Sequence, residues 1–86
     1  MKEFEVGKYY FARSLKKPRL MNIYKVVDCD RAFATIERFY SNEPQRLPIR
    51  LDFDGHYVML EDDVHGELLL SASNEWEMPS EALSHG

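Results

Sequence analysis

Cysteine is nearly absent from this chain of 86 residues, because Cys29 is the only one. A lone cysteine excludes an internal disulfide and any zinc site built from several thiolates, and it favours a reducing, cytoplasmic location. Apolar runs are short as well, and none approaches the roughly 20 residues that a membrane-spanning helix needs. The first residues carry charge instead of the apolar stretch of a secretory signal. We therefore expect a soluble, cytoplasmic protein that uses no membrane.

Helical periodicity over ten or more residues is also missing, and short strand patterns separated by turn residues fill the chain instead. The predicted strands lie at 7–13, 22–28, 32–40, 47–53, 57–60 and 67–71. Short strands joined by tight turns predict a mainly β fold, either a small barrel or a strongly bent antiparallel sheet of about five to six strands. An SH3-like barrel is the first choice and an OB-like barrel the second. We expect one domain over 1–76, followed at 77–86 by a tail that is disordered or contains one helical turn.

The clearest strand pattern is an alternation of apolar and polar residues just after the middle of the chain. The apolar set is Leu47, Ile49, Leu51 and Phe53. Such alternation predicts that this set faces the core while the intervening residues face solvent. Pro48 cannot donate a hydrogen bond to a neighbouring strand, which predicts an edge strand or a bulge. The pair Asp54-Gly55 predicts a tight turn into the next strand.

Positive charge is confined to the first 50 residues, which hold all eleven Lys and Arg against six acids, a net charge of +5. Residues 51–86 contain nine acids and no Lys or Arg, a net charge of −9, so the whole chain carries −4. Two explanations stay open. Opposite charges on paired strands neutralise each other within the molecule, or the surface is polarised into a basic and an acidic face for different partners.

The acidic half supplies the first candidate binding surface. Its members are Asp52, Asp54, Glu61, Asp62, Asp63 and Glu67. Carboxylates along one face can dock into a basic groove on a protein, even a groove that normally holds DNA. A solvated turn that aids solubility is the competing explanation. The leading hypothesis is therefore a non-catalytic protein-binding module or inhibitor, with a protein partner of unknown identity, that acts through this acidic face.

A basic loop with neighbouring aromatic rings supplies the second candidate surface. Its members are Tyr10, Phe11, Arg13, Lys16, Lys17 and Arg19. Cations neutralise phosphates and exposed rings stack on unpaired bases, so the alternative function is a small β-barrel that binds nucleic acid. Against it stand the acidic net charge and the possibility that the rings belong to the core. A third possibility is self-association, in which the two oppositely charged halves meet head to tail.

Catalytic chemistry finds little support in the sequence. Cys29 lies between Asp28 and Asp30, whose charges raise the pKa of its thiol and suppress the thiolate. No serine lies in a nucleophile motif, and there is no glycine-rich phosphate loop. His56 and His65 lack any standard metal-ligand spacing. We expect no enzymatic activity, no cofactor and no metal.

The opening of the chain is similar to that of a known group of proteins. Residues 4–14 read FEVGKYYFARS. This segment resembles the start of a family of short bacterial and mobile-element proteins, which share the opening F-x-V-G-K-x-Y-x-x-R-S, a hairpin and a compact β domain. The likeness continues loosely over 23–36 and then fades, and basic residues at 16–19 replace that family's acidic or cysteine-containing segment. The resemblance implies a phage or plasmid origin and transfers no function.

Overall fold

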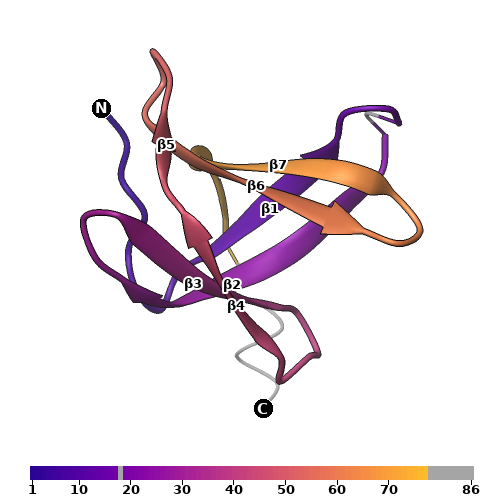
Figure 1. The fold of residues 1–86 in the computed structure, drawn as a ribbon, viewed down its shortest axis with the longest axis horizontal. Coiled ribbons are helices and arrows are strands. Elements are labelled where there is room, and N and C mark those ends of the chain that lie inside the picture. The colour runs from indigo at the N-terminus through magenta and orange to yellow at the C-terminus, as the bar shows by residue number, and fades with distance from the viewer. Residues whose placement is uncertain (18, 78–86) are drawn as a thin grey trace.

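The computed structural model describes residues 1–17 and 19–77, which form one seven-stranded antiparallel sheet (Figure 1). The strands are β1 (Tyr9–Ser14), β2 (Met21–Cys29), β3 (Phe33–Arg38), β4 (Pro44–Pro48), β5 (Arg50–Leu51), β6 (His56–Asp62) and β7 (Gly66–Trp76). Their order is β4-β3-β2-β1-β7-β6-β5. The sheet curls into a nearly closed barrel, because β4 and β5, which lie at its two ends, follow each other directly in the chain.

The predicted mainly β small barrel is therefore confirmed, whereas its assignment to an SH3-like or an OB-like type stays a prediction. The predicted tail at 77–86 lies, apart from residue 77, outside the described residues. No helix in the described ranges is long and apolar enough to cross a membrane.

β4 and β5 are two parts of one bent segment, because only Ile49 separates them. β4 pairs with β3 at one end of the sheet, and β5 pairs with β6 at the other end. The chain changes partner at Ile49, whose N–H donates to the carbonyl of Ala32 over 2.8 Å. The sheet has seven strands where five to six were expected, because this change of partner divides the predicted strand at 47–53.

The predicted core set of that strand divides at the same place. Leu47 and Ile49 pack against the core as predicted. Leu51 and Phe53 are instead 60% and 99% exposed. The prediction is wrong for both residues. Leu51 lies at the end of β5, a two-residue strand at the edge of the sheet, and Phe53 lies in a hydrogen-bonded turn over 52–55 that replaces the extended backbone that alternation requires.

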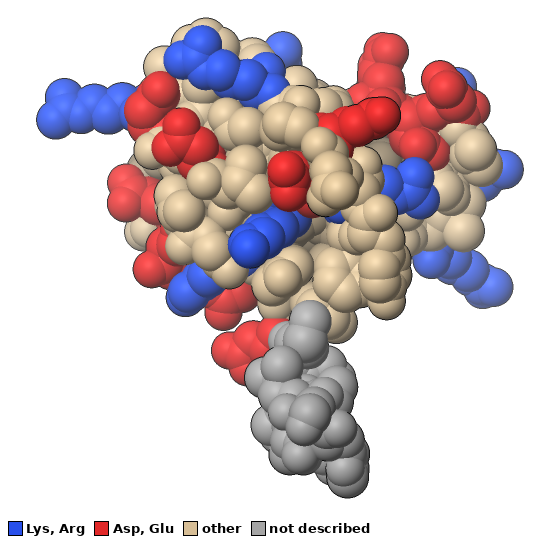
Figure 2. All heavy atoms as spheres, turned by 90° about the horizontal axis from the view of Figure 1, so that it is seen from below, with Lys and Arg blue, Asp and Glu red and all other residues tan. Residues whose placement is uncertain are grey.

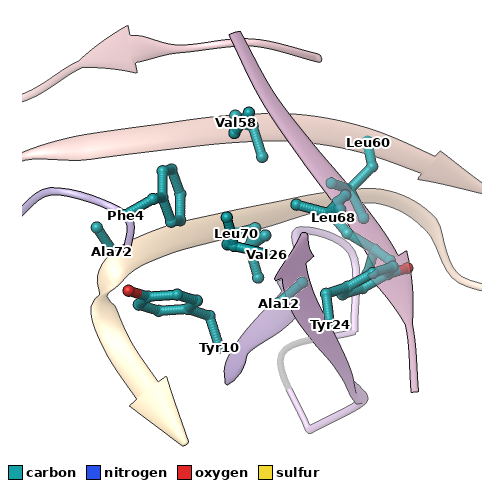
Figure 3. Close-up of a cluster of buried hydrophobic side chains, with 12 residues drawn as sticks. Phe4, Tyr10, Ala12, Tyr24, Val26, Val58, Leu60, Leu68, Leu70 and Ala72 are labelled. Atoms are coloured by element: carbon teal, nitrogen blue, oxygen red, sulfur yellow. The ribbon is translucent and has the colours of Figure 1, made fainter. Parts of the chain in front are cut away.

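Apolar side chains fill the barrel interior (Figure 3). The buried set is Phe4, Tyr10, Ala12, Tyr24, Val26, Ala34, Ile36, Val58, Leu60, Leu68, Leu70 and Ala72. Figure 3 shows Phe4 beside Tyr10 at one end of this cluster and Tyr24 at the other. The Tyr10 hydroxyl accepts a hydrogen bond from the Glu5 N–H over 2.9 Å, so its buried oxygen is satisfied. Because the interior is packed, a ligand must bind at the surface or at an opening of the sheet.

The segment before β1 closes one end of the barrel. Lys2 forms a parallel bridge with Gly55, and its carbonyl accepts a hydrogen bond from the His56 N–H over 2.9 Å. This contact places Phe4 against the core, where its ring centroid lies 5.1 Å from that of Tyr10. Gly55 has φ +136, and a Cβ there would lie 2.4 Å from the Lys2 oxygen. Glycine is required at this turn for both reasons.

Candidate binding site at the open seam

The barrel is open along one seam, because β4 and β6 approach each other without being hydrogen-bonded neighbours. We call the hollow between them the seam; its volume is about 520 Å³, and its lining is Gln45, Leu47, Arg50, Met59, Leu60, Glu61 and Glu67. Three of these side chains are apolar, and the other four are polar or charged. β5 covers only the first two residues of β6, so the remaining five have no strand on the seam side.

Prolines block the β4 edge of the seam. In an antiparallel pair, the backbone groups of successive residues point alternately toward and away from the partner strand. Since the Ile49 N–H donates to Ala32, the register of β4 and β3 directs the backbone groups of Pro44, Arg46 and Pro48 toward the seam. Proline has no N–H, so Arg46 supplies the only donor on this edge of β4. The predicted edge position of Pro48 is confirmed.

The β6 edge of the seam has no such protection. The Leu15 N–H donates to the Glu67 carbonyl over 3.0 Å, so the backbone groups of Glu67 face β1 rather than β6. The register of β6 and β7 then makes the backbone groups of Leu60 face β7, whereas those of Met59 and Glu61 face the seam. No strand of the described chain pairs with this side of Met59 or Glu61. Two N–H and two C=O groups are therefore free to bind an extended chain.

The six predicted acidic residues do not lie on one face. Asp52 and Asp54 lie in the turn before β6. The others surround the opposite end of β6: Glu61, Asp62, Asp63 and Glu67. Seven residues of extended chain span about 20 Å, so the two groups are too far apart to act as one surface. Only the second group adjoins the seam.

Glu61 and Glu67 form an unfavourable pair beside the seam. They lie directly opposite each other on β6 and β7, and both are exposed. Like charges at such positions destabilise a sheet. No Lys, Arg or His among the residues the structure describes lies within 4.0 Å of either carboxylate. Arg50 and Lys16 line the hollows around these carboxylates without forming an ion pair with them, so both carboxylates can still pair with a cation of a ligand.

Asp62 has a structural role instead. Its Oδ2 accepts hydrogen bonds from the His65 N–H over 2.9 Å and from the Val64 N–H over 3.2 Å, and it lies 2.5 Å from the His65 Nδ1. The His65 amide, followed by the His65 ring and the Val64 amide, lowers the pKa of the Asp62 carboxyl. Arg38 of β3 approaches the other carboxylate oxygen at 3.7 Å. Asp62 thus holds the β6–β7 turn in place.

The predicted nucleic-acid surface has its cations exposed, but one of its two aromatic rings is buried. Arg13 is exposed, and its guanidinium carbon lies 5.5 Å from the centroid of the partly buried Phe11 ring. Lys16, Lys17 and Arg19 are exposed as well. Tyr10 is only 1% exposed, so its predicted role in base stacking is wrong. Its ring belongs to the core and cannot reach a base.

The basic loop and the second acidic group are neighbours. Lys16 lines a common hollow with Glu61, Asp63 and Glu67. On the face drawn in Figure 2, Lys and Arg side chains are interspersed with Asp and Glu side chains. This arrangement supports neutralisation within the molecule more than a polarised surface.

Three partly buried aromatic rings and the exposed ring of Tyr40 form a group that the sequence did not predict. The ring centroids of Tyr9, Phe39 and Trp76 are 5.9 Å apart in each pair, and Tyr40 lies 4.0 Å from Phe39. Tyr40 is 96% exposed and has φ 73, a conformation that a bulky residue rarely adopts. The rings come from two strands, β1 and β7, and from the turn after β3, so only the sheet register brings them together. The one sequence signal was the Phe39-Tyr40 pair before a polar turn.

A second hollow, of about 470 Å³, lies at the barrel end closed by the first residues. Its lining is Glu3, Phe4, Cys29, Asp30, Arg31 and His56. Burial, followed by the Asp30 and Asp28 carboxylates, raises the pKa of the Cys29 thiol, which confirms the predicted direction. A thiol with a raised pKa is a weak nucleophile near neutral pH. Within residues 1–17 and 19–77, no three His, Cys, Asp or Glu side chains are grouped to hold a metal ion.

Comparison with known proteins gave no relative: no family model matches the chain, and neither the curated proteins nor the solved structures contain a significant match.

Proposed function

We propose that this chain is a non-catalytic module that binds a protein partner through the seam and the free carboxylates beside it. The observation that carries the proposal is an unprotected strand edge next to a hollow with apolar side chains, in a barrel whose interior is otherwise filled. Proteins normally protect exposed strand edges, because such edges pair with other chains. β4 has this protection and β6 does not, which supports a partner at β6.

An inhibitor is the form of this function that the charges favour. Glu61 and Glu67 lie beside the seam, and although Arg50 and Lys16 line the hollows around them, neither carboxylate forms an ion pair among the described residues, so they suit a basic surface on the partner. Charge complementarity of this kind speeds association and rejects acidic competitors. The resemblance of residues 4–14 to mobile-element proteins fits an inhibitor that acts in the cytoplasm on a host target.

Nucleic-acid binding by the basic loop has weaker support. Tyr10 is in the core, and Lys16 shares a hollow with four carboxylates that repel phosphate. The net charge of −4 also opposes binding to a polyanion. The experiment that tests the proposal must therefore also detect binding of nucleic acid.

Photo-cross-linking tests the proposal. Benzoylphenylalanine would replace Met59, which lines the seam, and in a control chain it would replace Asp28, which is exposed on β2. In extract of the source organism we expect a protein cross-link at position 59 and none at position 28. Excess unlabelled native chain should suppress this cross-link, and the same excess of the E61K chain should suppress it less. Equal labelling at both positions, or cross-links to nucleic acid alone, would contradict the proposal.

A further inference from the structure

We propose that the seam takes one extended segment of the partner as an additional strand on β6, with a lysine or arginine opposite Glu61. This inference rests on the proposed function and specifies the backbone conformation and the side-chain pattern of the ligand. It follows from three features of the seam: which backbone groups are free, which edge can use them, and which side chains border them.

The free backbone groups have the spacing that a strand requires. Met59 and Glu61 are two residues apart, and both direct N–H and C=O toward the seam. An antiparallel strand pairs with its neighbour at every second residue, so one extended segment can satisfy all four groups. β5 runs antiparallel to β6 in this position and leaves it when the chain turns away at Ile49. The incoming segment continues the path of β5 and runs in its direction.

Only one edge of the seam can receive this segment. Pro44 and Pro48 occupy two of the three β4 positions that face the seam, so β4 offers a single N–H there. The same prolines explain why β4 and β6 do not close the barrel on each other. Binding through β6 leaves the β3–β4 pairing unchanged.

The bordering side chains set the pattern of the ligand. Leu60 points into the core and is 4% exposed, while Met59 and Glu61 point to the outer face. Directly opposite residues of paired strands share a face. The ligand residue opposite Leu60 therefore points inward toward Leu47 and must be apolar, and the residue opposite Met59 is apolar as well.

Charge selects the residue opposite Glu61. That position lies in the same cross-strand row as Glu61 and Glu67, which repel each other. A lysine or arginine there offsets this repulsion, whereas a glutamate adds a third like charge to the row. Because the ligand runs antiparallel to β6, its sequence from N- to C-terminus is basic opposite Glu61, apolar opposite Leu60 and apolar opposite Met59.

The test uses a blocked peptide, acetyl-Thr-Lys-Val-Val-Thr-amide, and its glutamate counterpart in which Lys becomes Glu. We expect the lysine peptide to slow hydrogen exchange at the Met59 and Glu61 amides and to bind at least about tenfold more tightly than the glutamate peptide. N-methylation of its lysine removes an N–H that faces β6 and should weaken binding at least about tenfold. N-methylation of the first valine, whose N–H faces away from β6, should have little effect. Equal binding of the two methylated peptides would overturn strand addition.

Two variants of the protein separate the backbone contribution from the charge. E61P removes the free N–H without breaking a bond to β7, and it should abolish binding of the lysine peptide. E61Q retains the N–H and should weaken binding only about threefold. Circular dichroism checks that both variants fold. If E61P does not fold, the comparison of the two methylated peptides still tests strand addition. Capture of a protein at position 59 that E61P leaves unchanged would reject strand addition while the proposed function stands. No protein cross-link at position 59 in the chain that retains Glu61 would reject both.

Discussion

Replacement of Glu61 by lysine is expected to stabilise the fold and at the same time to abolish binding of a basic strand. Glu61 lies directly opposite Glu67, and both share a hollow with Asp63. An opposite-charge pair at such positions contributes roughly 0.2–1 kcal/mol and a like-charge pair costs a similar amount. The reversal should therefore raise the free energy of unfolding by about 1 kcal/mol. In a domain of this size that corresponds to a rise in Tm of roughly 4–8 °C.

Urea unfolding followed by the fluorescence of Trp76 measures this gain. E61Q removes the repulsion without adding an attraction, so it should give about half the effect of E61K. In 1 M salt, where the screening length is about 3 Å, both gains should largely disappear. A variant that is less stable than the native chain, or a gain that persists in 1 M salt, would refute the electrostatic explanation. A more stable variant that still binds the lysine peptide would show that this charge does not select the ligand.

Three further predictions concern the turns. G55A should be less stable than G66A by about 2 kcal/mol. Both glycines have positive φ, but only at Gly55 would the new Cβ lie 2.4 Å from a backbone atom. Equal midpoints of urea unfolding for the two variants would contradict this prediction. Y40G should raise stability by about 1 kcal/mol by relieving the strain at φ 73, whereas Y40A should not, and a loss in Y40G would mean that the ring contact outweighs the strain. Because folding lowers the pKa of the Asp62 carboxyl below 3.8, its contribution is present above that pH and is lost as the pH falls. Acid unfolding of D62N should therefore lose less stability between about pH 5 and 3, and an unchanged acid profile would reject this role.

The sequence predicted the features of the fold that depend on local residues. Alternation indicated strands, Asp54-Gly55 indicated a turn, and Pro48 indicated an edge, because each depends on neighbours within a few positions. The change of partner at Ile49 depends instead on β3 and β6, which lie on either side of it in the chain. For that reason the alternating pattern continues through Leu51 and Phe53, although the strand changes partner at Ile49 and ends at Leu51.

The candidate site was only partly predictable for a similar reason. Tyr10 and Phe11 are adjacent aromatic residues with opposite orientations, and composition alone does not tell which one faces the core. The contact of Tyr10 with Phe4 and its hydrogen bond with Glu5 settle the question. The acidic residues were recognised from sequence, but the distance between the two groups depends on the length of β6. The free edge of β6 follows from how β6 pairs with β5 and with β7. This pairing cannot be predicted from the sequence of β6 alone.

The same two carboxylates that would select a basic ligand also oppose self-association through β6. If two copies paired through their β6 edges, Glu61 and Glu67 of one copy would lie near the same two glutamates of the other copy. The backbone N–H and C=O groups of the two β6 edges could form hydrogen bonds with each other, but the like charges of the glutamates would repel. An open edge is compatible with a monomer only if something other than hydrogen bonding decides which strand it accepts. On the proposed function, the unfavourable Glu61–Glu67 pair would supply that choice, because it would discourage a second copy and favour a strand that presents a cation.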